Sequence, residues 1–411
     1  MYTEREVLTF VEENDVKFVK LSFCDPFGNL KNISILSDRL SDAFRRGFGF
    51  EGGALDGFEG EEDLFLFPDP ATLAVLPWRP QTGRVARLYC ELRRPDGTPF
   101  AGDGRRLLAE TCARAAKAGY RFGIGNECEF YLFETDEKGL PQKIPHDEAG
   151  YLDPSPLDRG ENVRRDVCLT LEQMGLAPLA SRHKRGPGQN EIAFAASDPL
   201  HAADNLITFR SVVKSVSARN GLFASFMPKP LPDRAGSGLT VGITLAADEK
   251  NLFSDPDKAR AFCMGILARL PEITLFLNPT ANSFARLAEN GMLAPTGGKA
   301  ALRIPAVTDP AAARIEIRSP DCACNPYLAY ALLLEAGLEG LKAGKDADAT
   351  LKRKLPETLG AAAEAARQSA FVGRVLPEVL REAVISEKTR EWETVCKQGE
   401  GLADERCFRT L

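Results

Sequence analysis

Two glutamates stand two residues apart in a run of strand-forming residues. Glu127 and Glu129 lie in the segment NECEFYLF, residues 126–133. Side chains two apart in a β-strand point to the same face of the sheet, so these carboxylates repel each other unless a cation lies between them. A solvated outer face is the alternative, but apolar and aromatic residues flank the pair on both faces. The segment therefore favours a buried pair of carboxylates that is linked to a cation.

Two further glutamates have strand-like surroundings. Glu191 lies in GQNEI, and Glu316 lies between Arg314 and Arg318 in RIEIR. In a strand, these two arginines and Glu316 share one face. Such an alternation is typical of an exposed charge ladder, and it is also typical of a site where arginines bind an anionic substrate near a metal. The residue types leave both interpretations open.

The first hundred residues have the pattern of a small α+β domain. Thr3 and Glu6 form a capping box, which begins an amphipathic helix that runs to about residue 13. The turn-forming sequence DPFGN, residues 25–29, separates two strand-like runs and predicts a hairpin. The strand-like runs of this part are 16–23, 30–36, 64–67 and 84–92. We expect them to form the sheet of a domain that ends near residue 100.

A larger domain is expected over residues 101–411. Its strand-like runs are 121–134, 192–194, 238–245, 301–304 and 315–318. Its helix-like runs are 105–118, 161–174, 202–220, 256–270 and 326–343, and the part after residue 356 is mainly helical. This mixture predicts an α+β domain built on an antiparallel sheet with flanking helices.

The composition excludes several classes of protein. The chain has 411 residues, of which 44% are hydrophobic and 27% charged, and its net charge is −6. No apolar run approaches the roughly 20 residues of a membrane-spanning helix, and a mildly acidic chain is a poor general binder of nucleic acids. The ten cysteines contain no CxxC pair and the three histidines are scattered, which argues against a zinc site and against a histidine cluster. The start of the sequence lacks a signal-peptide pattern, so we expect a cytoplasmic protein.

Taken together, these segments resemble the bacterial-type glutamine synthetases over nearly the whole chain. The matching segments include NDVKFVKLSFCDPFGNLKNISI (14–35), GFGFEG (47–52), PDPATL (68–73), LPWR (76–79), ECEFYLF (127–133), PGQNEI (187–192), FMPKP (226–230), NSF (282–284), RIP (303–305) and NPYL (325–328). So many matches in order are specific for the fold and say less about activity. The resemblance implies a β-grasp domain over 1–100 and a catalytic-type domain over 101–411.

The resemblance also implies an activity and a set of site residues. The family joins glutamate to ammonia with ATP and two Mg²⁺ or Mn²⁺ ions, which offset the repulsion between a carboxylate and a polyanion. The implied metal ligands are Glu127, Glu129, Glu191 and Glu316; the implied catalytic and substrate residues are Arg286, Arg303, Arg318 and Glu51; and the implied nucleotide-binding residues are Arg314 and Thr244. Family members form stacked hexameric rings, and the position of Glu51 serves the site of the neighbouring subunit.

Two of the family's six metal-ligand positions hold other residue types here. Lys184 stands where the family has a glutamate, and Thr240 stands where it has a histidine. Gly242 replaces a second histidine, which lies near the nucleotide. A lysine beside a metal repels it strongly, so we expect Lys184 to pair with Glu129 and Glu191 as an internal cation.

Several residues of the family's substrate site are also replaced in this sequence. Leu293 stands at the position of the glutamate that closes the active site, in a loop that is shorter than the family pattern. Gly298 aligns with an arginine and Ala311 with a lysine. Glu51 replaces an aspartate that binds ammonium.

We therefore expect a glutamine-synthetase-like protein with an impaired metal and ATP site. The first hypothesis is a non-catalytic sensor, scaffold or co-assembling regulator in nitrogen metabolism. The alternative is an ATP-dependent carboxylate–amine ligase, which makes glutamine or accepts an altered amine. The remaining possibility is a different, metal-independent reaction in the same cavity. The expected partners are further copies of the chain in a dodecamer of hexameric rings, a true glutamine synthetase, and an amino acid or amine, with neither nucleic acid nor membrane.

Overall fold

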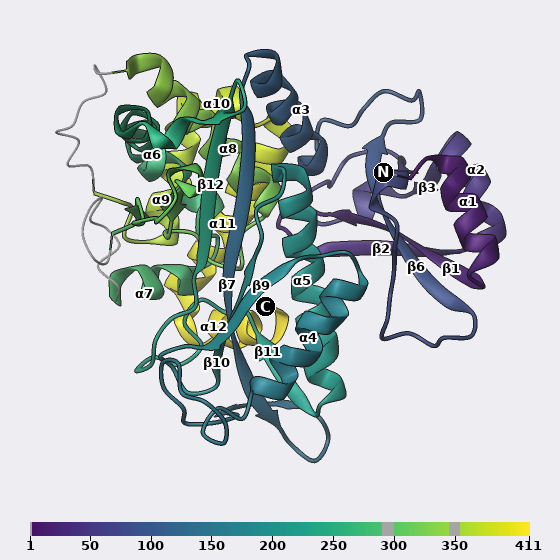
Figure 1. The fold of residues 1–411 in the computed structure, drawn as a ribbon, viewed down its shortest axis with the longest axis horizontal. Helices are drawn as coiled ribbons and strands as arrows, with labels where there is room; N and C mark the ends of the chain where they lie inside the picture. The colour runs from purple at the N-terminus through teal and green to yellow at the C-terminus, as the bar shows by residue number, and fades with distance from the viewer. Residues whose placement is uncertain (1, 290–299, 345–353) are drawn as a thin grey trace.

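The protein is built on two β-sheets that lie side by side (Figure 1). This computed structural model describes residues 2–289, 300–344 and 354–411. The smaller sheet belongs to the N-terminal part of the chain and the larger sheet to the remainder, as the sequence predicts. The α+β fold class is therefore confirmed.

The N-terminal sheet has the strand order β2-β1-β6-β4-β3, with β5 beside β6. Its elements are α1 (Glu4–Glu13), β1 (Val16–Cys24), β2 (Leu30–Leu36), α2 (Leu40–Arg46), β3 (Phe48–Phe50), β4 (Leu64–Pro68), β5 (Ala74–Val75) and β6 (Arg84–Arg93). The predicted hairpin is present: β1 and β2 are antiparallel, and the Asp25 carboxylate in their turn accepts hydrogen bonds from the N–H groups of Phe27 and Asn29. The pairing of β1 with β6 is parallel.

The larger sheet has nine strands among the described residues, with the order β14-β15-β12-β7-β10-β9. The strands are β7 (Arg121–Thr135), β8 (Pro141–Pro145), β9 (Pro178–His183), β10 (Gln189–Phe194), β11 (Leu222–Ser225), β12 (Leu239–Ala247), β13 (Lys250–Asn251), β14 (Leu302–Arg303) and β15 (Ile315–Ile317). Every recorded pair in this sheet is antiparallel. The long strands β7 and β12 run side by side through its middle (Figure 1).

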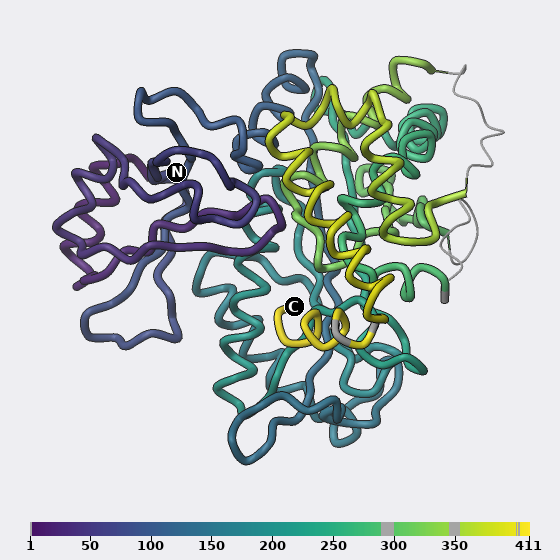
Figure 2. Tube along the Cα trace, turned by 180° about the vertical axis from the view of Figure 1, so that it is seen from behind, coloured from purple at the N-terminus to yellow at the C-terminus, as the bar shows by residue number. Residues whose placement is uncertain are grey.

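Helices pack around this sheet. They are α3 (Gly104–Lys117), α4 (Glu161–Gln173), α5 (Pro199–Arg219), α6 (Pro256–Leu277), α7 (Ala281–Glu289), α8 (Pro326–Ala343), α9 (Leu359–Gln368), α10 (Ala370–Val375), α11 (Glu378–Gln398) and α12 (Glu400–Thr410). The yellow C-terminal helices cover the rear of the molecule (Figure 2). Helices α6 and α8 approach closely because each has a glycine at the contact: a Cβ on Gly265 would lie 2.2 Å from the carbonyl oxygen of Ala336.

The structure differs from the sequence prediction in several elements. Helix α6 was expected to end at residue 270, before Pro271, but it continues to Leu277. The residues after Pro271 include Ile273 and Leu275, which are fully buried, so core packing outweighs the hydrogen bond that proline removes. The short elements α2, α7, β8, β9 and β11 were not predicted. No helix in the described part of the chain is long and apolar enough to cross a membrane.

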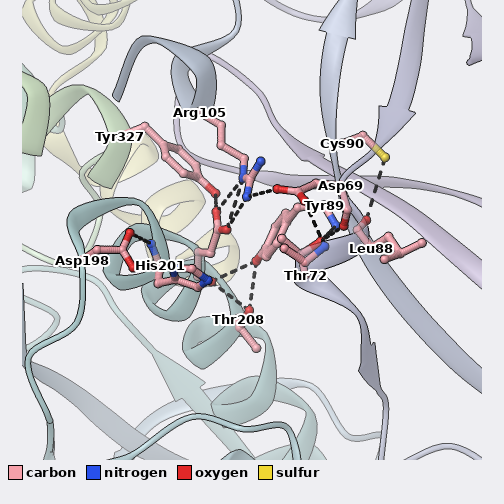
Figure 3. A network of polar contacts seen from close by, with 12 residues as sticks. Asp69, Thr72, Leu88, Tyr89, Cys90, Arg105, Asp198, His201, Thr208 and Tyr327 are labelled. Atoms are coloured by element: carbon pink, nitrogen blue, oxygen red, sulfur yellow. Dashed lines mark hydrogen bonds and ion pairs between the residues drawn. The ribbon is translucent and has the colours of Figure 1, made fainter. Parts of the chain in front are cut away.

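A buried polar network joins the two parts of the molecule (Figure 3). Arg105 Nη2 lies 2.9 Å from Asp69 Oδ2 on the N-terminal side and 2.9 Å from Asp204 Oδ2 on α5. Tyr327 donates to Asp204 Oδ1 at 2.6 Å, and Tyr89 donates to the Asp204 carbonyl at 3.0 Å. Asp204 therefore receives donors from three segments that lie far apart in the sequence, two at its carboxylate and one at its backbone carbonyl.

Candidate active site

A cavity of about 720 Å³ opens on the larger sheet. This volume falls within the usual range for small-molecule sites, about 300–1,000 Å³. Its charged lining residues are Glu127, Glu129, Glu191, Glu316, Lys184, Arg182, Arg185, Arg286, Arg303, Arg314 and Arg318. The structure thus brings together all four predicted metal-ligand glutamates and four predicted arginines.

Strand register explains how the glutamates come together. Glu129 on β7 stands opposite Glu191 on β10. Glu127 on β7 stands opposite Thr240 on β12, and Gly242, two residues further on, stands opposite Glu316 on β15. Residues at paired positions of neighbouring strands have their Cβ atoms about 5 Å apart, so three strands, β7, β10 and β15, bring their carboxylates to one face.

Lys184 lies between two of these carboxylates. Its Nζ is 3.0 Å from Glu129 Oε1 and 2.7 Å from Glu191 Oε2. Burial alone would lower the pKa of Lys184, but the two carboxylates outweigh that effect and hold it above its usual value. Lys184 is therefore charged near neutral pH. The expectation that Lys184 acts as an internal cation agrees with this geometry.

Arg182 supplies a second cation that sequence reasoning missed. It stands opposite Glu191 in the pairing of β9 with β10, and its Nε lies 2.9 Å from Glu191 Oε1. Arg182 and Lys184 are two residues apart, the spacing that puts strand side chains on one face. That spacing could have revealed Arg182 if β9 had been predicted as a strand.

Glu316 is held by two arginines. Arg303 Nε lies 3.0 Å from Glu316 Oε2, and Arg314 Nη2 lies 2.8 Å from Oε1. Glu316 is nearly inaccessible, whereas the side chain of Arg303 is 53% exposed. Each oxygen of this carboxylate therefore already has a guanidinium partner.

Glu127 differs from the other three glutamates because it forms no ion pair among the described residues. Burial raises its pKa, and the neighbouring carboxylates of Glu191 and Glu316 raise it further. Lys184 and Arg182 lower the pKa by smaller amounts. Glu127 is thus a partly buried carboxylate whose surroundings, taken together, disfavour its charged form.

These residues do not fit a pair of divalent metals. At the first position, Lys184 Nζ fills the space between Glu129 and Glu191. An ammonium 4 Å from a dication would repel it by roughly 8 kcal/mol at an effective dielectric of about 20. At the second position, Glu316 is bound by two guanidiniums, and Glu127 and the neutral Thr240 are what the described part of the chain leaves beside it.

Two predicted residues lie elsewhere. Glu51 precedes a short 3₁₀ turn next to β3 in the N-terminal domain and does not line the cavity of its own chain. The Thr244 hydroxyl donates to the Gly123 carbonyl and is also outside the lining. Ala311 lies in a 3₁₀ turn before β15. The positions of Leu293 and Gly298 fall outside the described residues.

A second group of possible metal ligands is already satisfied by protein donors. Asp147, Asp158 and His183 lie close together and are buried. Asp147 accepts hydrogen bonds from His183 Nε2 at 2.9 Å and from Gly188 N at 2.7 Å, and Asp158 pairs with Arg164. Burial raises the pKa of Asp147, but these donors outweigh it and hold the pKa at about 2. The group therefore braces the segment that carries Lys184.

Comparison with known proteins places the chain among relatives of one kind. The family description "Glutamine synthetase, beta-Grasp domain" matches residues 15–95, and "Glutamine synthetase, catalytic domain" matches residues 101–402. The glutamine synthetase of Clostridium saccharobutylicum is 45% identical over 83% of this chain and 80% of the relative. That of Methanosarcina mazei is 40% identical over 95% of this chain and 94% of the relative.

Solved structures agree with the sequence comparisons. A structure described as apo GmaS without ligand has a TM-score of 0.85 and 28% identity, and the match covers 98% of this chain and 99% of that one. The Plasmodium falciparum glutamine synthetase has a TM-score of 0.86 at 20% identity, over 97% of both chains, which shows the shared fold alone. With both family descriptions matched in order along a two-sheet fold of this kind, the chain belongs to the glutamine synthetase family.

Proposed function

We propose that this chain is a non-catalytic member of the family, which binds an anionic small molecule and acts as a sensor or as a regulator of a true glutamine synthetase. The observation that carries the proposal is the ion pair of Lys184 with both Glu129 and Glu191. A protein cation takes the place where ATP-driven amide formation needs a metal. Arg182, on β9, adds a second protein cation beside Glu191.

A ligase with an altered amine substrate is the second candidate. Arg286, Arg303 and Arg318 line the cavity as the family's substrate arginines would. Relatives named glutamine synthetase are 36–45% identical to this chain. Such an enzyme would have to bind ATP with Mg²⁺ at a site that now holds Lys184, so metal binding separates the two candidates.

We also propose that the chain assembles with copies of itself into hexameric rings, with the domain boundary near residue 100. Large apolar side chains are exposed on the N-terminal sheet: Phe18 is 44% exposed and its cross-strand neighbour Leu36 is 53% exposed. Glu51, remote from the cavity of its own chain, would then face a neighbouring subunit. Light scattering would show a mass of six or twelve chains, and a monomeric mass would exclude the rings.

Titration calorimetry with Mg·ATP, together with metal analysis after incubation with Mn²⁺, tests the loss of metal chemistry. The unmodified protein should retain no Mn²⁺ and show no micromolar affinity for Mg·ATP. Lys184→Glu restores a carboxylate between Glu129 and Glu191, so it should bind Mn²⁺ about 10–100-fold more tightly than the unmodified protein.

Lys138→Glu is the matched control, because Lys138 lies in an exposed turn before β8. It makes the same charge change outside the cavity and should leave metal binding unaltered. Micromolar Mg·ATP binding by the unmodified protein, with phosphate release in the presence of glutamate and an amine, would instead establish a ligase.

A further inference from the structure

Two buried cysteine side chains meet on the face of the larger sheet that lies away from the cavity. Cys128 Sγ lies 2.8 Å from Cys322 Sγ, and both side chains are fully buried. Cys128 stands on β7 between Glu127 and Glu129, so the alternation of strand side chains turns it to the opposite face. A disulfide holds its sulfur atoms about 2.0 Å apart. A shift of less than about 1 Å would therefore bring these two sulfurs to bonding distance.

The two sulfurs come from segments of different kinds. Cys128 lies within the long strand β7, whereas Cys322 lies in the turn between β15 and α8, 194 positions further along the chain. Cys322 Sγ also lies 3.4 Å from the carbonyl oxygens of Glu129, on β7, and of Gly238, just before β12. A bond between the sulfurs would therefore join the turn before α8 to the middle of the sheet.

The segment that leads into this turn also contacts the lining of the cavity. Arg286 Nη2 donates to the carbonyl oxygens of Ser319 and Pro320, which precede the turn. The N–H group of Leu239, at the start of β12, donates to the Pro320 carbonyl at 2.9 Å. A link that fixes the turn against β7 would therefore also fix the backbone that holds a cavity arginine.

We propose that Cys128 and Cys322 form a disulfide that locks the turn before α8 to β7 when the protein meets a small-molecule disulfide such as oxidised glutathione. One protein thiolate attacks a sulfur of the oxidant and releases one small thiol; the other then attacks the mixed disulfide at the protein sulfur and releases the second. The two cysteines lose two electrons and two protons, and the oxidant takes up both as its two thiols. The link does not depend on what the cavity binds.

Burial decides which thiol reacts first and how fast. Burial raises the pKa of the Cys128 thiol, its contact with Cys322 raises it further, and Arg210 lowers it by a smaller amount. The thiolate is the reactive form, so Cys128 is a poor first nucleophile. Cys322 lies in a turn, which can open without breaking the ladder of the sheet. We therefore expect Cys322 to attack the oxidant and Cys128 to close the link, slowly in the folded protein and quickly once it is partly unfolded.

Refolding of the full chain from urea in a glutathione redox buffer, followed by acid quenching and alkylation, tests the proposal. With oxidised glutathione in excess, the refolded chain should lose two of its ten alkylatable thiols, and a digest should contain the peptides of Cys128 and Cys322 joined together. Dithiothreitol should release the link quickly in urea and slowly without it. A link between another pair of cysteines, or no link in the refolded protein, would overturn the proposal.

Two variants locate the link. Cys322→Ala should abolish the joined peptides, and Cys322→Ser is the second variant for the case that Cys322→Ala folds poorly, because serine keeps the size of the side chain. Cys324→Ala is the matched control, since Cys324 is a fully buried thiol two residues further along the same segment. Loss of the joined peptides in Cys324→Ala would show that the pairing is wrong.

The lock itself should be visible in amide hydrogen exchange. The N–H group of Glu129 donates to the Gly238 carbonyl, and that of Leu239 donates to the Pro320 carbonyl, both beside the linked sulfurs. Exchange at these two amides should slow at least about tenfold in the oxidised protein. Cys324→Ala should show the same slowing and Cys322→Ser none. Equal exchange in the oxidised and reduced forms would contradict a lock on this turn.

Discussion

At the scale of single residues, Lys184 decides what the cavity can hold. Its ammonium group makes two short ion pairs in a partly buried place, and its side chain is 19% exposed. Removing one partner of a buried charged group is costly because the other charges remain without compensation. The effect of Lys184 should therefore be visible in the stability of the protein as well as in its ligand binding.

We expect Lys184→Met to lower the free energy of unfolding by about 2 kcal/mol, since it leaves Glu129 without its cation and Glu191 with Arg182 alone. Urea denaturation measures the change. Mn²⁺ should raise the melting temperature of this variant and not that of the unmodified protein, because the two carboxylates become free to bind it. Lys138→Met serves as the control, and an unchanged denaturation midpoint for Lys184→Met would contradict the prediction.

Removing the charge of Glu127 should have the opposite effect on stability from removing the charge of Lys184. Its carboxylate is partly buried, close to Glu191 and Glu316, and makes no ion pair among the described residues. Glu127→Gln removes the repulsion while it keeps the shape of the side chain, so we expect it to stabilise the fold by about 1 kcal/mol at pH 7. A lower melting temperature in calorimetry would show that Glu127 has a stabilising partner.

At the scale of elements, Asp103 couples the start of α3 to β6. Its carboxylate accepts hydrogen bonds from Arg106 N at 3.1 Å, as the N-cap of the helix, and from Leu92 N at 3.0 Å on the strand. Burial raises the pKa of Asp103 to about 6, although these two hydrogen bonds work in the other direction. One buried carboxylate thus joins the first element of the large domain to the last strand of the small one.

The raised pKa gives a signed dependence on pH. The folded protein binds the Asp103 proton more tightly than the unfolded chain, whose aspartate pKa is about 3.9. The contribution of Asp103 to stability is therefore complete below pH 4 and is lost as the pH rises through about 6. Relative to Asp103→Asn, the free energy of unfolding should fall by up to about 3 kcal/mol between pH 4 and pH 7. A difference that does not vary with pH in urea titrations would contradict this.

At the scale of the whole molecule, the buried network around Asp204 holds the two sheets in one orientation. Arg105 is the cation that connects Asp69 of the N-terminal part to Asp204 of α5 (Figure 3). We expect Arg105→Met to cost about 3 kcal/mol, because it leaves Asp204 buried with the hydroxyl of Tyr327 as its remaining side-chain donor. In scanning calorimetry we expect the unmodified protein to melt in one transition, and that transition should broaden or split in the variant.

Arg219→Met is the control for that experiment, since Arg219 carries the same charge on an exposed side chain at the end of α5. If both variants melted as sharply as the unmodified protein and at the same temperature, the network would not be what couples the two parts.

The sequence by itself determined the family, the α+β class, the hairpin at Asp25 and the four glutamates of the cavity. These features depend on local patterns: strand periodicity, turn residues and ordered motifs. The sequence also showed that Lys184 stands where the family has a metal-ligand glutamate, and a charged lysine cannot act as a metal ligand. The short strand β9 was not predicted. The pairing of Arg182 with Glu191, which depends on β9, was therefore not predicted either.

Only the tertiary structure decided how the charges pair. Glu129 and Glu191 are 62 positions apart in the chain, and the register of β7 with β10 makes them neighbours. The same holds for Arg303 and Glu316, which meet across β14 and β15. Whether a carboxylate faces a metal, a lysine or an arginine depends on which strands lie side by side and in what register, and a single slip would turn each side chain to the other face.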